Sequence, residues 1–225
     1  MEGEIRQRTG DRYFLMMHGD ATYAIPSGEK MEAWCAWLYD NLEEAKDEAQ
    51  GRVDKRLKKA LALKRHGGLD GFALCSDYCF NVGPFLSPGM FGQVVTPYLK
   101  QLVAGLRELG FYAIKHTDGD IMPILDDLVA AKPHALHSID PQAGVDIAQV
   151  KRLVGDQVAL IGNVNCGLLS SGTDEEVIAS ARYALENGMP GGGYIYSTSN
   201  CIYTGMPLSR YELMLDVWRK EGNYS

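Results

Sequence analysis

The chain has 225 residues, of which 46% are hydrophobic, 23% charged and 9% aromatic, proportions typical of a soluble globular protein with a full core. Its formal net charge is −7, from 22 basic and 29 acidic residues. A nucleic-acid-binding protein needs a basic stripe to hold phosphates, and the densest basic run, at 52–65, is helix-like and preceded by acids. The composition therefore disfavours a nucleic-acid partner.

Membrane insertion and export are not expected either. No apolar run approaches the roughly 20 residues of a membrane span, and residues 1–7 lack the basic and apolar regions of a signal peptide. The cysteines are odd in number and follow no disulfide framework, which indicates free thiols in a reducing compartment. We therefore expect a cytoplasmic protein. The five cysteines are Cys35, Cys75, Cys79, Cys166 and Cys201.

Short apolar runs alternate with longer stretches of helical periodicity, which predicts strands followed by helices. Most of these runs are almost continuously apolar, as expected for strands covered on both faces of a parallel sheet. The six predicted strands are Arg12–His18, Gly71–Ser76, Tyr112–His116, Ala135–Ile139, Val158–Val164 and Tyr194–Thr198.

Capping signals predict where the helices begin and end. Two helical segments are expected between residues 27 and 67, the second capped by Asn41. Ser87 precedes a proline and predicts a helix over 88–109 with a kink at Pro97. Thr173 and Ser209 each stand three residues before a glutamate and predict capping boxes for the last two helices.

Alternation of strands and helices predicts an α/β fold with a parallel sheet, either doubly wound or a (β/α)8 barrel. The glycine fingerprint of nucleotide-binding open sheets is absent, and Gly191–Gly193 precedes a strand instead of following one. No low-complexity stretch or linker interrupts the chain, so we expect one domain over residues 1–225.

Polar or ionisable side chains follow all six predicted strands, which favours an enzyme because parallel α/β proteins gather their chemistry at the carboxyl ends of strands. His116 and Cys201 follow two different strands and offer the nitrogen and sulfur donors that zinc prefers. Without a metal, His116 and Asp118 are candidate catalytic residues that act as an acid/base pair. The candidate substrate-binding residues are Tyr23, Asp77, Asp140, Asn163 and Asn200.

Several linked motifs resemble the uroporphyrinogen decarboxylase superfamily. They are Asp77–Phe91 (DYCFNVGPFLSPGMF), Pro97–Lys100 (PYLK), His116–Pro123 (HTDGDIMP), Leu160–Val164 (LIGNV), Gly191–Asn200 (GGGYIYSTSN) and Gly205–Pro207 (GMP). The resemblance implies a TIM (β/α)8-type barrel with its site at the carboxyl mouth. It also implies an incomplete barrel, because the first predicted strand resembles the family's third. About six of eight βα units, corresponding to strands 3–8, are expected, without the family's N-terminal third.

Two branches of this superfamily differ in their site residues. Zinc-dependent methyltransferases carry His-x-Cys after the fifth strand and a Cys after the eighth. Here Asp118 follows His116, and Cys201 lies one residue after the position of the last ligand, which Asn200 occupies. Decarboxylases carry a catalytic Asp in the missing third and a His where Asn200 stands, whereas their Tyr corresponds to Tyr23.

The resemblance implies three alternative functions. The first is transfer of a methyl group between a small-molecule substrate and a corrinoid protein, with zinc as a cofactor. The second is uroporphyrinogen decarboxylation, a carboxy-lyase reaction of porphyrin biosynthesis. The third is a non-catalytic binding module derived from a barrel. Six strands would leave two open sheet edges, so we also expect a homo-oligomer that closes them.

Overall fold

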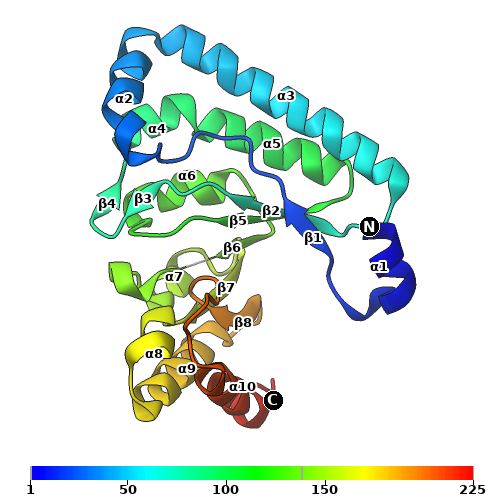
Figure 1. The fold of residues 1–225 in the computed structure, drawn as a ribbon, viewed down its shortest axis with the longest axis vertical. Helices are drawn as coiled ribbons and strands as arrows, with labels where there is room; N and C mark the ends of the chain where they lie inside the picture. The colour runs from blue at the N-terminus through cyan, green and yellow to red at the C-terminus, as the bar shows by residue number, and fades with distance from the viewer. Residues whose placement is uncertain (1, 138, 225) are drawn as a thin grey trace. The chain divides into compact units, whose positions relative to one another are not determined.

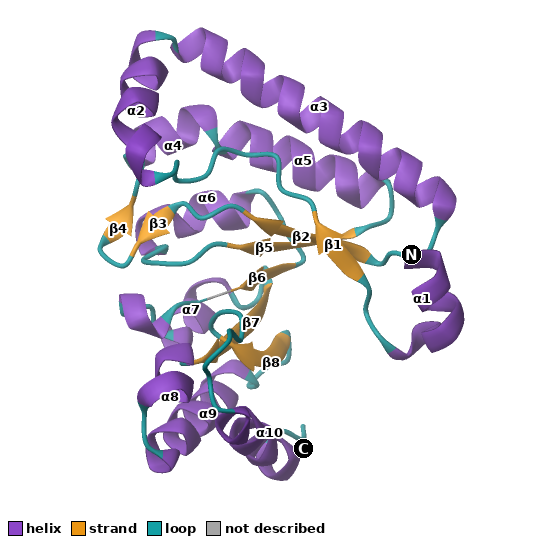
Figure 2. Cartoon of the chain, viewed as in Figure 1, coloured by secondary structure: helices purple, strands orange, loops and turns teal. Residues whose placement is uncertain are grey.

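The computed structural model describes residues 2–137 and 139–224. The chain forms two compact units. Unit 1 comprises Met1–Tyr78, Pro84–His116 and Pro123–His134, and unit 2 comprises Cys79–Gly83, Thr117–Met122 and Ala135–Ser225. Each unit contains parallel strands together with helices that follow them along the chain (Figure 1, Figure 2). This division does not test the prediction of a single domain, which stays a prediction.

Unit 1 contains three parallel strands in the order β1-β2-β5. They are β1 (Met16–His18), β2 (Gly71–Cys75) and β5 (Tyr112–His116). The first strand is shorter than predicted, because Arg12 lies in a 3-10 turn, η1 (Gly10–Arg12), and residues 13–15 are not part of a strand. A helix that the sequence did not predict, α1 (Glu2–Thr9), precedes this turn.

The helices of unit 1 are α2 (Met31–Asp40), α3 (Leu42–His66), α4 (Pro88–Val94), α5 (Thr96–Glu108) and α6 (Leu125–Ala130). The predicted effect of Pro97 is confirmed, because the expected 88–109 helix is divided at Val95 into α4 and α5. Figure 1 shows α3 and α5 side by side. Gly105 of α5 lies against α3, and a Cβ atom there would come within 2.6 Å of Leu57 Cδ1, so the leucine side chain would have to shift.

The core of unit 1 forms where these helices meet β2. Phe72 of β2 is 1% exposed and packs edge-on against Phe111, with ring centroids 5.0 Å apart. Leu74 is fully buried, as is Leu102 of α5. The almost continuous burial of β2 confirms that it is covered on both faces, as the apolar run predicted.

Unit 2 contains the parallel strands β6 (Ala135–His137), β7 (Ala159–Val164) and β8 (Tyr194–Thr198), in that order. The expected strand at 135–139 ends early because Ile139 adopts a left-handed φ of +55°, and Ser138 lies outside the described residues. The helices of this unit are α7 (Ile147–Val154), α8 (Cys166–Ser171), α9 (Asp174–Gly188) and α10 (Leu208–Glu221). Short elements elsewhere in the chain are β3 (Cys79–Phe80), β4 (Gly83–Pro84), η2 (Gly28–Lys30), η3 (Met122–Ile124) and η4 (Pro141–Ala143).

The helix caps agree only in part with the sequence signals. Ser87 and Thr173 cap α4 and α9 as predicted, and Thr173 forms a full capping box with Glu176. The capping box predicted at Ser209 is wrong, because α10 already begins at Leu208, after a proline. Asn41 does precede α3, but its amide donates to the Trp37 carbonyl instead of capping the helix.

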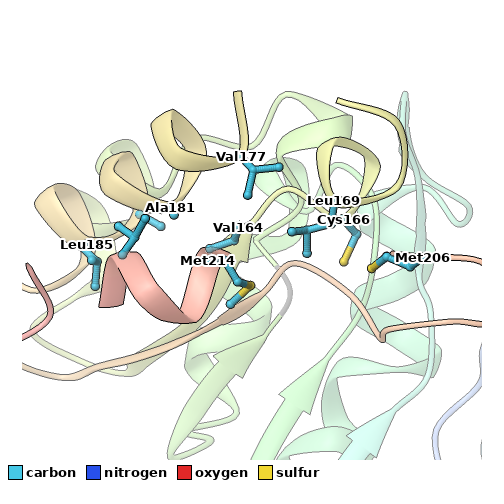
Figure 3. Packing of buried hydrophobic residues seen from close by; sticks show 10 residues of the cluster. Val164, Cys166, Leu169, Val177, Ala181, Leu185, Met206 and Met214 are labelled. Atoms are coloured by element: carbon cyan, nitrogen blue, oxygen red, sulfur yellow. The ribbon is translucent and has the colours of Figure 1, made fainter. Parts of the chain in front are cut away.

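The core of unit 2 lies where α8, α9 and α10 meet β7. Figure 3 shows Val164 of β7 among Val177 and Ala181 of α9 and Met214 of α10. Cys166, at the start of α8, is 3% exposed and belongs to the same cluster. The core therefore extends to the start of α8, next to the carboxyl end of β7, where candidate site residues lie.

Candidate functional site

In unit 1, the carboxyl ends of β2 and β5 bring two predicted site residues together. Cys75 pairs with His116 in the parallel register, so Asp77 follows its strand beside the end of β5. His116 Nε2 lies 3.8 Å from Asp77 Oδ1, and the two side chains are 16% and 53% exposed. An imidazole beside a carboxylate is an arrangement that can exchange a proton with a bound substrate.

A buried ion pair lies beside these residues. Lys115 is fully buried, and its Nζ is 2.8 Å from Asp20 Oδ2, on a side chain only 6% exposed. The same ammonium donates to the carbonyl oxygens of Leu74 and Ser76, at 3.1 and 3.0 Å. One ammonium thus joins the ends of β1, β2 and β5, and fixes the backbone that leads to Asp77.

The charges of this ion pair depend on each other. Burial alone would raise the pKa of Asp20, but the charge of Lys115 and hydrogen bonds from Lys115 and Thr22 lower it below its ordinary value. Burial lowers the pKa of Lys115, while the charge of Asp20 opposes that change. The ionised pair is therefore stable only while both members are present.

Aromatic and hydroxyl groups enclose the ion pair. Lys115 Nζ lies 4.0 Å from the centroid of the Tyr78 ring, a cation–π contact. The hydroxyls of Tyr78 and Thr22 are hydrogen-bonded, and Thr22 also donates to Asp20. The sequence interpretation did not single out Lys115, although a lysine inside an otherwise apolar strand was the available signal.

Tyr23, a predicted substrate-binding residue, packs against α3. Its hydroxyl donates to the Ala45 carbonyl at 2.9 Å and is 3.4 Å from Glu48 Oε2. The Arg52 guanidinium lies 4.5 Å from the centre of its ring. Burial and the nearby charge of Glu48 raise the pKa of Tyr23 to about 12. Substrate binding by this tyrosine stays a prediction.

Unit 2 brings together Asp118 and Asn200, also predicted site residues. Asn200 Nδ2 donates to Asp118 Oδ2 at 2.6 Å. The backbone of Asn200 is itself held, because Thr198 Oγ1 donates to its carbonyl at 2.6 Å and its N–H donates to Cys166 Sγ at 3.2 Å. Asn200 is thus a positioned donor that orients a carboxylate. The sequence had no signal for Cys166 in this role, because its pairing with Asn200 spans 34 residues.

The remaining site candidates in unit 2 lie at or after the ends of strands, and each forms a hydrogen bond within the protein. Asp140 Oδ1 accepts from Gln142 N and caps η4. Asn163 is 5% exposed and donates to the Ile139 carbonyl at 3.1 Å. Cys201 is exposed, and its N–H donates to Asn200 Oδ1. Substrate binding by Asp140 and Asn163, and metal binding by Cys201 and His116, stay predictions.

A protein-family comparison matches residues 21–221 to the model described as uroporphyrinogen decarboxylase (URO-D). The chain belongs to the uroporphyrinogen decarboxylase family. It is also similar to a curated uroporphyrinogen decarboxylase of Thioalkalivibrio sulfidiphilus (strain HL-EbGR7), with 26% identity over 149 residues, 62% of this chain and 40% of the relative.

The fold is similar to that of a solved methyltransferase from Methanosarcina mazei, with a TM-score of 0.79 and 18% identity. The match covers 99% of this chain and 63% of the methyltransferase. The α/β fold class is confirmed as an incomplete TIM-barrel type, and the described residues supply six parallel strands. The chain thus spans less than two thirds of either protein. None of the helices in residues 2–137 and 139–224 combines the length and apolar character needed to cross a bilayer.

Proposed function

We propose that this member of the URO-D family transfers a methyl group between a small substrate and a corrinoid protein. The similarity in fold to a methyltransferase supports this proposal. The observation that carries it is the contact between His116 and Asp77 at 3.8 Å, at the ends of two neighbouring strands. It provides a half-buried proton donor at the edge where parallel α/β proteins carry their sites.

The chemistry requires a proton at the leaving atom. When a methyl group leaves an ether oxygen or an amine nitrogen as a cation equivalent, the bonding electrons stay on that atom, which then gains a proton. We assign the donation of this proton to His116, which lies beside the carboxylate of Asp77. Lys115 positions Asp77 through the Ser76 carbonyl, and we assign it no contact with substrate.

An alternative form of the proposal has a zinc ion bound through His116, which is then a neutral ligand and does not itself donate the proton. Imidazole nitrogen and carboxylate oxygen are both zinc ligands. The 3.8 Å between His116 Nε2 and Asp77 Oδ1 is within the roughly 4.2 Å that two such metal–ligand bonds span. When bound, zinc would polarise the leaving oxygen and make a bound thiol or water more acidic. Cys201 is proposed as a further ligand.

The first experiment measures methyl transfer to cob(I)alamin from a panel of methyl ethers, methylamines and methyl thiols, followed by the change in its visible absorption. We expect turnover with at least one donor and a loss of about 100-fold or more in His116→Ala, the usual range for a general acid. His66→Ala, an exposed histidine at the end of α3, is the matched control and should retain activity. No turnover with any donor would refute the proposal.

The second experiment measures zinc per chain in protein purified without chelator. The zinc form predicts one zinc ion in the wild type and in His66→Ala, and its loss in His116→Ala. Loss in Cys201→Ala as well would make Cys201 a ligand, whereas retention there would refute that assignment alone. No zinc in the wild type would remove the metal from the proposal.

A second candidate function is uroporphyrinogen decarboxylation, because the curated relative carries that name over 149 aligned residues. It is tested on the same protein by turnover of uroporphyrinogen. Production of decarboxylated porphyrinogens with no methylation of cob(I)alamin would establish this alternative. If neither reaction occurs, the non-catalytic binding module is favoured.

A further inference from the structure

A basic cavity lies in unit 1 between α3 and the loop that follows β1. Its volume is about 470 Å³, within the range of pockets that hold small molecules. On one side is the loop Asp20–Thr22, and on the other is a stripe of cations on α3 with a spacing of three and four residues. We call this the α3 basic cavity. The cations that line it are Arg52, Lys55, Arg56 and Lys59.

Most of the positive charge in this cavity lacks a compensating carboxylate. Arg52 pairs with Glu48 at 2.6 Å, one turn earlier on α3. Lys55, Arg56 and Lys59 have no acidic residue three or four positions away in either direction, the positions where helix ion pairs form. Among the described residues, Lys55 and Lys59 form no ion pair. This is unusual in a chain of net charge −7.

The acidic residue in the cavity wall does not neutralise these cations. Asp20 turns its carboxylate inward to Lys115, where its side chain is 6% exposed. It presents its carbonyl oxygen to the cavity side instead, and this oxygen accepts a hydrogen bond from Arg56 at 3.2 Å. The buried ion pair thus removes the carboxylate from competition with an incoming anion.

The two guanidinium groups are held before any ligand arrives. Arg56 is fixed by the Asp20 carbonyl, and Arg52 by Glu48 and by stacking on the Tyr23 ring. A guanidinium that is already ordered loses less freedom when it binds an oxyanion, and its planar fork suits carboxylate or phosphate oxygens. The flexible lysines then add charge from the neighbouring helical turns.

We infer that the α3 basic cavity binds a small oxyanion carrying at least two negative charges, through phosphate or carboxylate groups. We commit to a small molecule as the occupant because the helix and the loop bound a volume of about 470 Å³; an acidic segment of another protein is the alternative that the test separates. The site lies between a helix and the loop after β1, and does not include His116 or Asp77. It therefore does not depend on the proposed methyl transfer.

The test is isothermal titration calorimetry of the full chain with inorganic pyrophosphate and, separately, with citrate, at constant ionic strength and pH 7.5. We expect saturable binding of at least one anion at one site per chain. Which of the two binds more tightly distinguishes phosphate from carboxylate as the natural group. The double variant Lys55→Gln/Lys59→Gln should weaken binding at least tenfold, because it removes two cations and preserves a good helix former.

Lys58→Gln is the matched control. Lys58 is an exposed lysine next to Lys59 on the same helix, but it does not line the cavity. We expect it to change affinity less than twofold. The inference is overturned if neither anion shows saturable binding. It is also overturned if Lys58→Gln loses as much affinity as the double variant. Binding of polyglutamate in the absence of binding to either small anion would also overturn it, in favour of a protein partner.

Discussion

Replacement of Lys115 by methionine should destabilise the chain severely, because it leaves the carboxylate of Asp20 buried without its cation. The two charges lie 2.8 Å apart on side chains that are 0% and 6% exposed. With an effective dielectric constant of about 20, their attraction is roughly 6 kcal/mol. Desolvation offsets much of this attraction, but loss of one partner of a buried pair costs about 3–5 kcal/mol.

The assay is urea unfolding at pH 7.5, supported by thermal unfolding, where a loss of this size lowers the midpoint by roughly 6–20 °C in a chain of this length. Lys58→Met, on the surface of α3, is the matched control and should lie within about 0.5 kcal/mol of the wild type. The double variant Asp20→Asn/Lys115→Met should recover much of the loss, since no buried charge remains.

The pH dependence has a definite sign. In the wild type the pKa of Asp20 is lowered. The ion pair therefore contributes its full stabilisation above the unfolded pKa of about 3.9, and this stabilisation is lost as the pH falls through the folded pKa. In Lys115→Met, burial raises the pKa of Asp20, so the variant regains stability as acid protonates it. The difference between the two proteins should therefore shrink from pH 7.5 to 4.5. The reasoning is refuted if Lys115→Met unfolds within 1 kcal/mol of the wild type, or if the double variant is no more stable than the single one.

Three further predictions concern caps and site geometry. Thr173→Ala should cost about 1 kcal/mol in urea unfolding because it removes the α9 capping box, whereas Ser209→Ala should be nearly neutral, and equal losses would contradict the assignment. Asn200→Ala should cost about 1.5–3 kcal/mol, since a hydrogen bond to a carboxylate is lost; a neutral result in urea unfolding would show that this bond contributes little. In an alkaline absorbance titration, Tyr23→Phe should lack one tyrosine that ionises at about pH 12 in the wild type. Tyrosine in an unfolded chain ionises near pH 10, so loss of a tyrosine signal near pH 10 in the variant would contradict this prediction.

The sequence by itself determined the local features of this protein. Apolar runs placed the strands β2, β5, β7 and β8 to within a residue at their ends. For β2 and β7 the physical reason is that a strand covered on both faces has few polar positions. Pro97 predicted the division between α4 and α5, and Thr173 the start of α9, because both effects act within one helical turn. The linked motifs were sufficient to identify the family, and the match over residues 21–221 confirms it.

The signals failed where a competing contact or conformation intervened. Ile139 adopts a left-handed backbone conformation that ends the predicted strand early, and a 3-10 turn at Gly10–Arg12 takes the first residue of the strand predicted at 12–18. Ser209 carried a capping signal, but α10 starts before it. These outcomes depend on packing around the residue, and composition within a short window does not contain that information.

Only the tertiary structure decided which side chains meet. Lys115 and Asp20 are 95 residues apart in sequence, and the α3 cations lie 30 or more residues from the loop that faces them. The parallel register brings His116 beside Cys75 and so beside Asp77, whereas Asn200 reaches Asp118 across 82 residues. A sequence shows that a lysine in an apolar strand needs a partner, because a buried charge is costly alone. Which carboxylate supplies that partner is decided by the fold.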